Sequence, residues 1–278
     1  MKTLNAFSIL LTASLIVFVS CAKNDKASGD QPTTELSTTV QLSAADDQLN
    51  EGLSAAMDAA DGTEDGGADL RPMSCAVVTT NISLKTITVD FGSGCINPVN
   101  GKNRSGKIII GYNGVTYLLS TERTIRFDNF KAADTVTMNG VFTQSNIVRL
   151  NNKVNFTLSS SDFIFLFPGG KTNTLVSYNH DFIIDLGTNP RDMGDNSITI
   201  TGSTTGINTE GEPYSVTTTV PVVFNGECSA SQIFYPVTGA YDIKIGNKPR
   251  FNLSWGTGAC DKVIRLTFLG TTIDVALK

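Results

Sequence analysis

The chain contains a single histidine, His180, and therefore offers few arrangements for acid–base or metal chemistry. One imidazole cannot build a multi-histidine metal site. Nucleophilic catalysis would need His180 to pair with a serine and an orienting carboxylate, and no G-x-S-x-G, H-E-x-x-H or phosphate-loop pattern occurs in the sequence. We interpret His180 as a strand residue without a catalytic role, and we expect no catalytic residues, no cofactor and no metal.

Carboxylates are the widest remaining route to catalysis, because glycosidases need only two of them, about 5 to 9.5 Å apart. Four lie in or near predicted strands: Asp90, Asp128, Asp181 and Asp185. As neighbours on one strand face, Asp181 and Asp185 would be about 13 Å apart, too far for this mechanism. An enzyme therefore stays an alternative that requires distant carboxylates to converge in a cleft.

The sequence also allows two kinds of ligand binding, of calcium and of glycans. Asp192, Asp195 and Asn196 could hold calcium through oxygen ligands, but the run lacks alternating Asp-x-Asp-x-Asp spacing, so a polar hairpin turn is favoured. Glycan binding typically uses aromatic platforms with polar handles. The aromatic residues that stay open for that role are Tyr112, Tyr117, Tyr235, Tyr241 and Trp255.

Four cysteines in the body of the chain form an even set: Cys75, Cys95, Cys228 and Cys260. In an exported protein such a set indicates two disulfides. Three pairings are possible, and we favour Cys75–Cys95 and Cys228–Cys260 because each encloses a stretch that looks like paired strands. A four-cysteine zinc site is the competing interpretation, but neither pair has the short C-x(2–4)-C spacing of structural zinc sites.

The fifth cysteine, Cys21, follows an uncharged apolar run over 6–19, with Lys2 upstream. This run is too short to span a bilayer comfortably but suits the core of a signal peptide. The junction Phe18-Val19-Ser20-Cys21 resembles a bacterial lipoprotein signal, although Phe18 stands where an aliphatic residue is usual. The resemblance implies a signal peptide over 1–20 and acylation of Cys21 by fatty acids such as palmitate. An ordinary signal peptide or a buried cysteine is the alternative.

Polar sequence follows this junction. Residues 21–40 contain almost no large apolar side chain and predict a flexible tether. Over 41–74 we expect a short amphipathic helix, at about 44–61, and then an acidic, glycine-rich linker; Leu49, Leu53, Met57 and Ala60 share one helical face, which Gly52 weakens. The chain has 21 basic and 26 acidic residues without a Lys/Arg cluster, which argues against a nucleic-acid partner.

From residue 75 to 278 the pattern predicts a single all-β domain. Short runs of Val, Ile, Thr, Phe and Tyr alternate with turn residues, including Asn113-Gly114, Asn139-Gly140 and Asn225-Gly226. With no helical periodicity in this region, we expect a mainly antiparallel meander, a sandwich or an open barrel. The predicted strands are 83–91, 107–112, 124–130, 135–143, 153–159, 174–186, 197–204, 214–224, 241–245, 251–255, 262–268 and 272–277.

One predicted strand differs from the others. The run Asp162-Phe-Ile-Phe-Leu-Phe-Pro168 is apolar at consecutive positions, which predicts a central strand covered on both faces. A hydrophobic surface that binds a ligand, a protein or a membrane is the alternative.

Two cysteine-containing corners are similar to each other. The runs Thr88-Val-Asp-Phe-Gly-Ser-Gly-Cys95 and Asn252-Leu-Ser-Trp-Gly-Thr-Gly-Ala-Cys260 share a strand, an aromatic residue, a Gly-Ser/Thr-Gly bend and a cysteine. They are either a true internal repeat or convergence on a good corner. The run 87–95, together with the segments 100–110, 201–211, 214–217 and 258–262, resembles uncharacterised lipoproteins of the Bacteroidetes cell envelope. This resemblance implies outer-membrane attachment and no known activity.

These observations lead to one functional hypothesis and one alternative. We expect an outer-membrane-anchored lipoprotein that acts as a non-enzymatic structural or protein-interaction module of the cell envelope, held at the bilayer by Cys21. Its partners would be envelope proteins or surface glycans rather than nucleic acid. The alternative is a lipoprotein that binds surface ligands or glycans. Whether it faces the periplasm or the outside stays open.

Overall fold

The structure is a computed structural model of the 278-residue chain. It describes the helical positions 49, 51–53, 55, 56 and 60, and the ranges 75–96, 101–132, 136–188, 193–230, 235–261 and 263–276. The predicted tether (21–40), the linker and Cys21 lie outside the described residues. In the part of the chain that is described, no helix is both long enough and apolar enough to cross a membrane.

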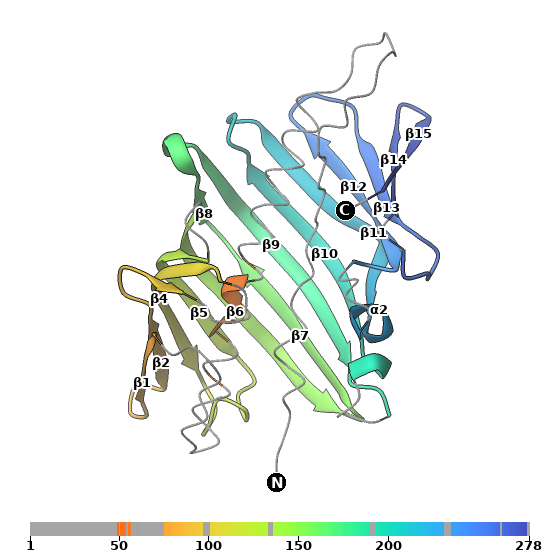
Figure 1. Ribbon diagram of the computed structural model, residues 1–278. Helices are drawn as coiled ribbons and strands as arrows, with labels where there is room; N and C mark the ends of the chain where they lie inside the picture. The colour runs from red at the N-terminus through yellow and green to blue at the C-terminus, as the bar shows by residue number, and fades with distance from the viewer. Residues whose placement is uncertain are drawn as a thin grey trace.

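The described residues from 75 onward form one sheet, and every strand pairing in it is antiparallel (Figure 1). The predicted antiparallel all-β fold is therefore confirmed, as an open meander. The strands are β1 (Val77–Asn81), β2 (Thr86–Asp90), β3 (Cys95–Ile96), β4 (Asn103–Tyr112), β5 (Arg123–Lys131), β6 (Thr137–Leu150), β7 (Lys153–Ser160), β8 (Phe163–Leu166), β9 (Thr172–Asp185), β10 (Ser197–Ile207), β11 (Pro213–Asn225), β12 (Thr238–Ile245), β13 (Phe251–Trp255), β14 (Val263–Phe268) and β15 (Thr271–Ala276).

Strand order follows chain order almost throughout. The main path runs β1-β2-β4-β5-β6-β7-β9-β10-β11-β12-β13-β14-β15, with β3 added to β4, and β8 placed between β6 and β9. The short helices η1 (Pro168–Gly170), η2 (Met193–Asp195) and α2 (Gly226–Ala230) lie in connections. The sheet does not close on itself, so β1 and β15 are its two edges, at opposite margins of the molecule (Figure 1).

One face of the sheet, here called the inner face, is buried. Alternate residues of each central strand point to it, as in β13, where Phe251, Leu253 and Trp255 are buried and the residues between them are partly exposed. Its middle is an aromatic cluster of Phe127, Phe130, Phe142 and Phe163, in which Phe163 lies 4.7 Å from Phe142 and 5.6 Å from Phe127 between ring centroids. The outer face is largely polar, with exposed apolar side chains such as Val141, Ile164 and Ile183 among the polar ones.

The helical positions between 49 and 60 pack on the inner face near β4–β6 (Figure 1). Leu49, Leu53 and Ala60 are buried there, which confirms the predicted apolar stripe at these positions, while Met57 lies outside the described residues. Gly52 is needed for close packing, because a Cβ atom at this position would lie 2.6 Å from the ring of Phe127. Glu51 forms an ion pair with Arg104 of β4. The glycine that weakens the helical pattern therefore permits its docking.

Three local predictions were wrong. The segment 162–168 is covered on one face only: Phe163 and Phe165 of β8 are buried, whereas Ile164 is 38% exposed. Asn139-Gly140 does not form a turn but lies inside β6, where Gly140 leaves room for the ring of Phe163. Residues 83–85 belong to a turn, and the strand β1 that precedes it was not predicted.

Candidate functional site

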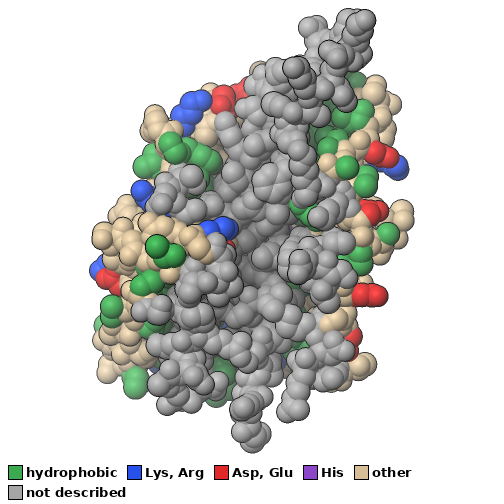
Figure 2. All heavy atoms as spheres, viewed as in Figure 1, with side chains coloured by type: hydrophobic (Ala, Val, Ile, Leu, Met, Phe, Trp, Pro, Cys, Tyr) green, Lys and Arg blue, Asp and Glu red, His purple; other side chains and the backbone are tan. Residues whose placement is uncertain are grey.

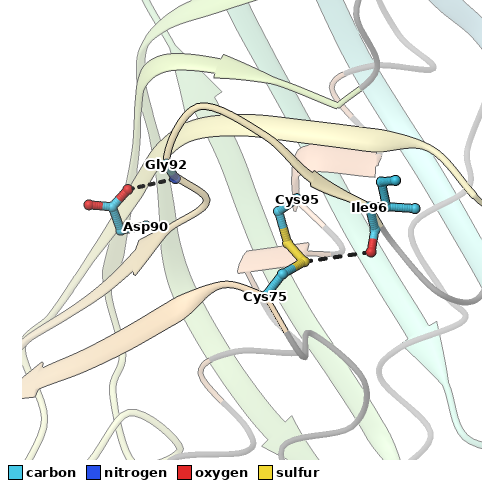
Figure 3. The surroundings of a disulfide bond; sticks show 5 residues. All are labelled: Cys75, Asp90, Gly92, Cys95 and Ile96. Atoms are coloured by element: carbon cyan, nitrogen blue, oxygen red, sulfur yellow. Dashed lines mark hydrogen bonds between the residues drawn. A yellow bond between two sulfur atoms is a disulfide. The ribbon is translucent and has the colours of Figure 1, made fainter.

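Two disulfides fix the connections near the two margins of the sheet. Cys75 bonds to Cys95 and Cys228 bonds to Cys260, with sequence separations of 20 and 32 residues. Both predicted local pairings are therefore confirmed. The first bridge joins the residue that leads into β1 to β3 (Figure 3). The second joins α2 to the connection between β13 and β14.

The two similar corners differ in their surroundings. In the first, the Asp90 side chain accepts a hydrogen bond from the Gly92 amide at 2.9 Å (Figure 3), and β3 continues the chain into β4. In the second, the Gly258 amide donates to the Val237 carbonyl at 2.9 Å, and the described residues between β13 and β14 form no strand. The corner aromatic residue is buried in both. A shared origin of the two corners stays a prediction.

Three buried polar side chains, from Arg123, Gln144 and His180, lie in one cross-strand row on the inner face, next to the aromatic cluster. The register places Arg123 of β5 opposite Gln144 of β6, Gln144 opposite Leu158 of β7, and Leu158 opposite His180 of β9. All are buried. Sequence reasoning did not single out Arg123 or Gln144, although their alternation with Ile125 and Phe142 along the strands was a signal that they face inward.

The buried guanidinium of Arg123 contacts neutral groups. Its Nε and Nη2 atoms donate to the Tyr117 carbonyl at 3.2 and 2.9 Å, and Nη1 donates to Gln144 Oε1 at 3.4 Å. The guanidinium carbon lies 3.7 Å from the centroid of the Tyr117 ring, a cation–π distance. These contacts tie the connection between β4 and β5 to the sheet, and they give Arg123 a structural task.

His180 is buried and neutral. Its Nε2 atom lies 2.9 Å from the hydroxyl of Thr204, its ring stacks on Tyr178 at 4.3 Å, and Nδ1 has no hydrogen-bond partner. Burial lowers the pKa of His180 from 6.5 to about 4. Opposite it, Gly202 has no side chain, and a Cβ atom there would lie 2.6 Å from the His180 Cα. Proton abstraction near neutral pH suits this imidazole poorly, because the best catalytic pKa lies near the operating pH.

The candidate carboxylates are engaged separately on the sheet. Lys107 pairs with Asp90 at 2.9 Å and Lys153 pairs with Asp185 at 2.7 Å. In each case the hydrogen bond from the lysine is the main cause that lowers the pKa of the aspartate. Asp181 accepts a hydrogen bond from Thr157 at 2.7 Å, and Asp128 accepts one from Asn129. Each therefore serves a local cross-strand or neighbouring contact.

The proposed calcium turn is only partly described, since Asp192 lies outside the described residues. Asp195 accepts hydrogen bonds from the amide and the hydroxyl of Thr188, at 2.8 and 3.0 Å, as expected of a polar turn. Among the described residues, no group of three His, Cys, Asp or Glu side chains is placed to hold a metal ion.

A shallow pocket of about 250 Å³ lies beside the turn between β1 and β2. Gly111 and Thr124 face each other across β4 and β5 there, and Thr124 Oγ1 takes up the space where a side chain at position 111 would begin. Of the five aromatic residues considered for glycan stacking, Tyr117, Tyr235 and Trp255 are buried and Tyr112 and Tyr241 are partly buried. No aromatic side chain in the described ranges is fully exposed, so no stacking platform is visible there.

The site that the structure assembles is thus a set of structural contacts: two disulfide corners, a buried polar row and cross-strand ion pairs. Comparisons of this chain with protein-family models, with curated proteins and with solved structures found no match.

Proposed function

We propose that this protein is an outer-membrane-anchored lipoprotein that acts as a non-enzymatic structural or protein-interaction module of the cell envelope. The single observation that carries the proposal is the pair of disulfides, Cys75–Cys95 and Cys228–Cys260. Stable disulfides form in oxidising compartments outside the cytoplasm. Export agrees with the signal-like N-terminus, and the fifth cysteine, Cys21, is the one that the lipoprotein-like junction reserves for acylation.

The interaction role is supported by the shape of the sheet. Its outer face is long and carries many polar side chains, and each edge is a strand that has one neighbour among the described strands. Edge strands present unpaired backbone groups to which another chain can add. The described side chains that could do chemistry are taken up by structural contacts, as His180 and Arg123 are on the inner face. Binding of another protein fits this arrangement better than turnover of a substrate.

Labelling with an alkyne analogue of palmitate tests the anchoring. We expect the wild-type chain to take up the label and to sediment with outer membranes, and Cys21→Ser to lose both properties. Ser20→Ala is the matched control, because it changes the neighbouring small residue and keeps the thiol. Label that persists in Cys21→Ser would refute acylation at this position.

Crosslinking in intact cells, followed by mass spectrometry, tests the interaction role. We expect lysines of the outer face, such as Lys107 and Lys153, to crosslink reproducibly to an envelope protein or to another copy of this chain. The control is the same experiment on cells that express an unrelated lipoprotein of similar abundance. If replicates yield only links within one chain, the interaction role is wrong.

A further inference from the structure

The C-terminal edge of the sheet has the features of an interface. Among the described strands, β15 pairs with β14 alone, through a hairpin whose two-residue turn is Leu269-Gly270, both with positive φ. In such a hairpin the residues that flank the turn share hydrogen bonds, and every second residue after them does so too. The backbone groups of Thr271, Ile273 and Val275 therefore point to β14. Those of Thr272, Asp274 and Ala276 point away from the sheet and have no strand partner among the described residues.

The side chains of β15 are also less covered than those of the strands inside the sheet. Ile273 faces the same side as Leu266 of β14, which belongs to the inner face, yet Ile273 is 54% exposed. Figure 2 shows hydrophobic side chains at this margin of the molecule, interspersed with charged ones. One further strand beside β15 would cover Ile273 and satisfy the outward backbone groups together.

Strand direction decides which edge of a second copy fits. Twelve antiparallel steps join the thirteen strands of the main path, so β1 and β15 run in the same direction. Copies that stack head to tail would have to join β15 to β1 as a parallel pair. A two-fold axis that brings β15 against β15 gives an antiparallel pair like all others in this sheet, and it closes after two copies.

The charge of Asp274 and the exposed side chain of Ile273 then decide which residue of β15 lies at the two-fold axis. If the two-fold axis passed Asp274, each Asp274 would face its own copy, a destabilising pair of like charges. If it passes Ile273, Thr272 faces Asp274 of the partner subunit and the two Ile273 side chains face each other. Asp274 keeps its ion pair with Arg265, at 2.8 Å. Thr272 and Asp274 then make two hydrogen-bonded pairs with the partner subunit, about four hydrogen bonds in all.

We propose that two copies of this chain join through their β15 strands around a two-fold axis at Ile273, which continues the antiparallel sheet across the dimer. The other edge is the poorer candidate, because only Val78 and Thr80 of β1 direct backbone groups outward. The Tyr112 amide donates a hydrogen bond to the Lys85 carbonyl, so every second residue from Lys85 onward directs its backbone groups to β4. The residues between them bond to β1, which leaves the backbone groups of Val78 and Thr80 pointing away from the sheet. The dimer names a partner for the interaction role and in that respect rests on the proposed function. It does not depend on acylation.

Sedimentation velocity over a concentration series tests the edge, with the full chain carrying Cys21→Ser so that neither lipid nor a free thiol interferes. We expect a concentration-dependent dimer, since one added strand buries a small interface. Thr272→Pro removes an outward N–H from each copy, half of the dimer's hydrogen bonds, and leaves the hairpin ladder intact, so dimerisation should weaken about tenfold or more. Thr80→Pro is the matched control on β1 and should leave dimerisation unchanged. Equal effects of both variants, or a chain that stays monomeric, would overturn the proposal.

Cysteine crosslinking tests the register in the same background. Ile273→Cys puts two thiols directly opposite each other at a non-hydrogen-bonded pair, where the Cα atoms are about 4.5 Å apart and a disulfide can form. Val275→Cys is the control, because Val275 faces Thr271 of the partner subunit and the two introduced thiols lie about 13 Å apart. We expect covalent dimer from the first variant only. Equal yields from both variants would rule out the register. A wild-type chain that takes up no lipid label would refute the anchoring and leave the dimer standing.

Discussion

The centre of the inner face and the C-terminal hairpin are built from the same antiparallel pairing and are stabilised in different ways. In the centre, Phe142 and Phe163 are fully buried and touch several other rings. In the hairpin β14–β15, Ile273 is half exposed, and the visible contacts are a turn, the Arg265–Asp274 ion pair and a hydroxyl contact between Thr267 and Thr272. Strand pairing alone does not bury a residue. Burial needs neighbours on both sides and packing above the face.

The largest expected effect comes from emptying the centre. Phe163→Ala should lower the free energy of unfolding by about 3–5 kcal/mol, because it removes a buried ring and leaves a cavity among Phe127 and Phe142. Ile164→Ala is the matched control one residue away, since that side chain lies on the outer face and should cost less than about 1 kcal/mol. Urea unfolding followed by tryptophan fluorescence measures both. Equal losses would mean that the two faces of β8 are covered alike.

Removal of each disulfide in turn compares the stability of the two margins of the sheet. Cys75→Ala/Cys95→Ala and Cys228→Ala/Cys260→Ala open loops of similar length, 20 and 32 residues of sequence separation. Each double variant should lose about 3–4 kcal/mol of unfolding free energy on the loop-entropy model. Thermal and urea unfolding of both variants check this. A much smaller loss at the second bridge would show that the C-terminal margin is already open in the oxidised, folded protein.

Acid should lower the free energy of unfolding, because His180 is buried on the inner face. Its pKa is about 4 in the folded protein and 6.5 in the unfolded chain, so between these values the unfolded chain binds a proton that the folded protein does not. Stability is therefore complete above pH 6.5 and falls as the pH drops towards 4, by up to about 3 kcal/mol.

The measurement is urea unfolding at pH 7 and pH 5 for the wild type and for His180→Phe. The wild type should lose roughly 2 kcal/mol between these pH values, following 1.36 kcal/mol per pH unit below 6.5. His180→Phe should lose much less, because the aspartates whose pKa values are lowered by lysine partners titrate below this window. An identical pH dependence of the two proteins would contradict the assignment to His180.

The alternation of apolar and polar residues was enough to predict most strands, and the strand-like stretches that the cysteines enclose were enough to favour the two local disulfides. Prediction from the sequence failed where a residue's structure is decided by contact with a residue far away in the chain. Asn139-Gly140 has the composition of a turn, but Gly140 stays in β6 because the distant Phe163 ring packs over it. Strand β1 is almost fully exposed and lacks alternation, so its only strong signal is its partner β2. The partner of Arg123 likewise depends on the register between β5 and β6.

The smallest effect tests whether the hairpin depends on its turn. Leu269 has φ +47° in the turn with Gly270, a conformation that costs a non-glycine side chain and that Asn tolerates best. Leu269→Asn should stabilise the hairpin by about 1 kcal/mol. Hydrogen exchange of the β14 and β15 amides is the direct measurement, because slower exchange there reports less frequent local opening. Leu84→Asn is the control, an exposed leucine in a turn without positive φ, and should leave that exchange unchanged. If Leu269→Asn slows exchange in the central strands as much as in β14 and β15, the hairpin and the centre open as one unit, and the contrast between them concerns burial alone.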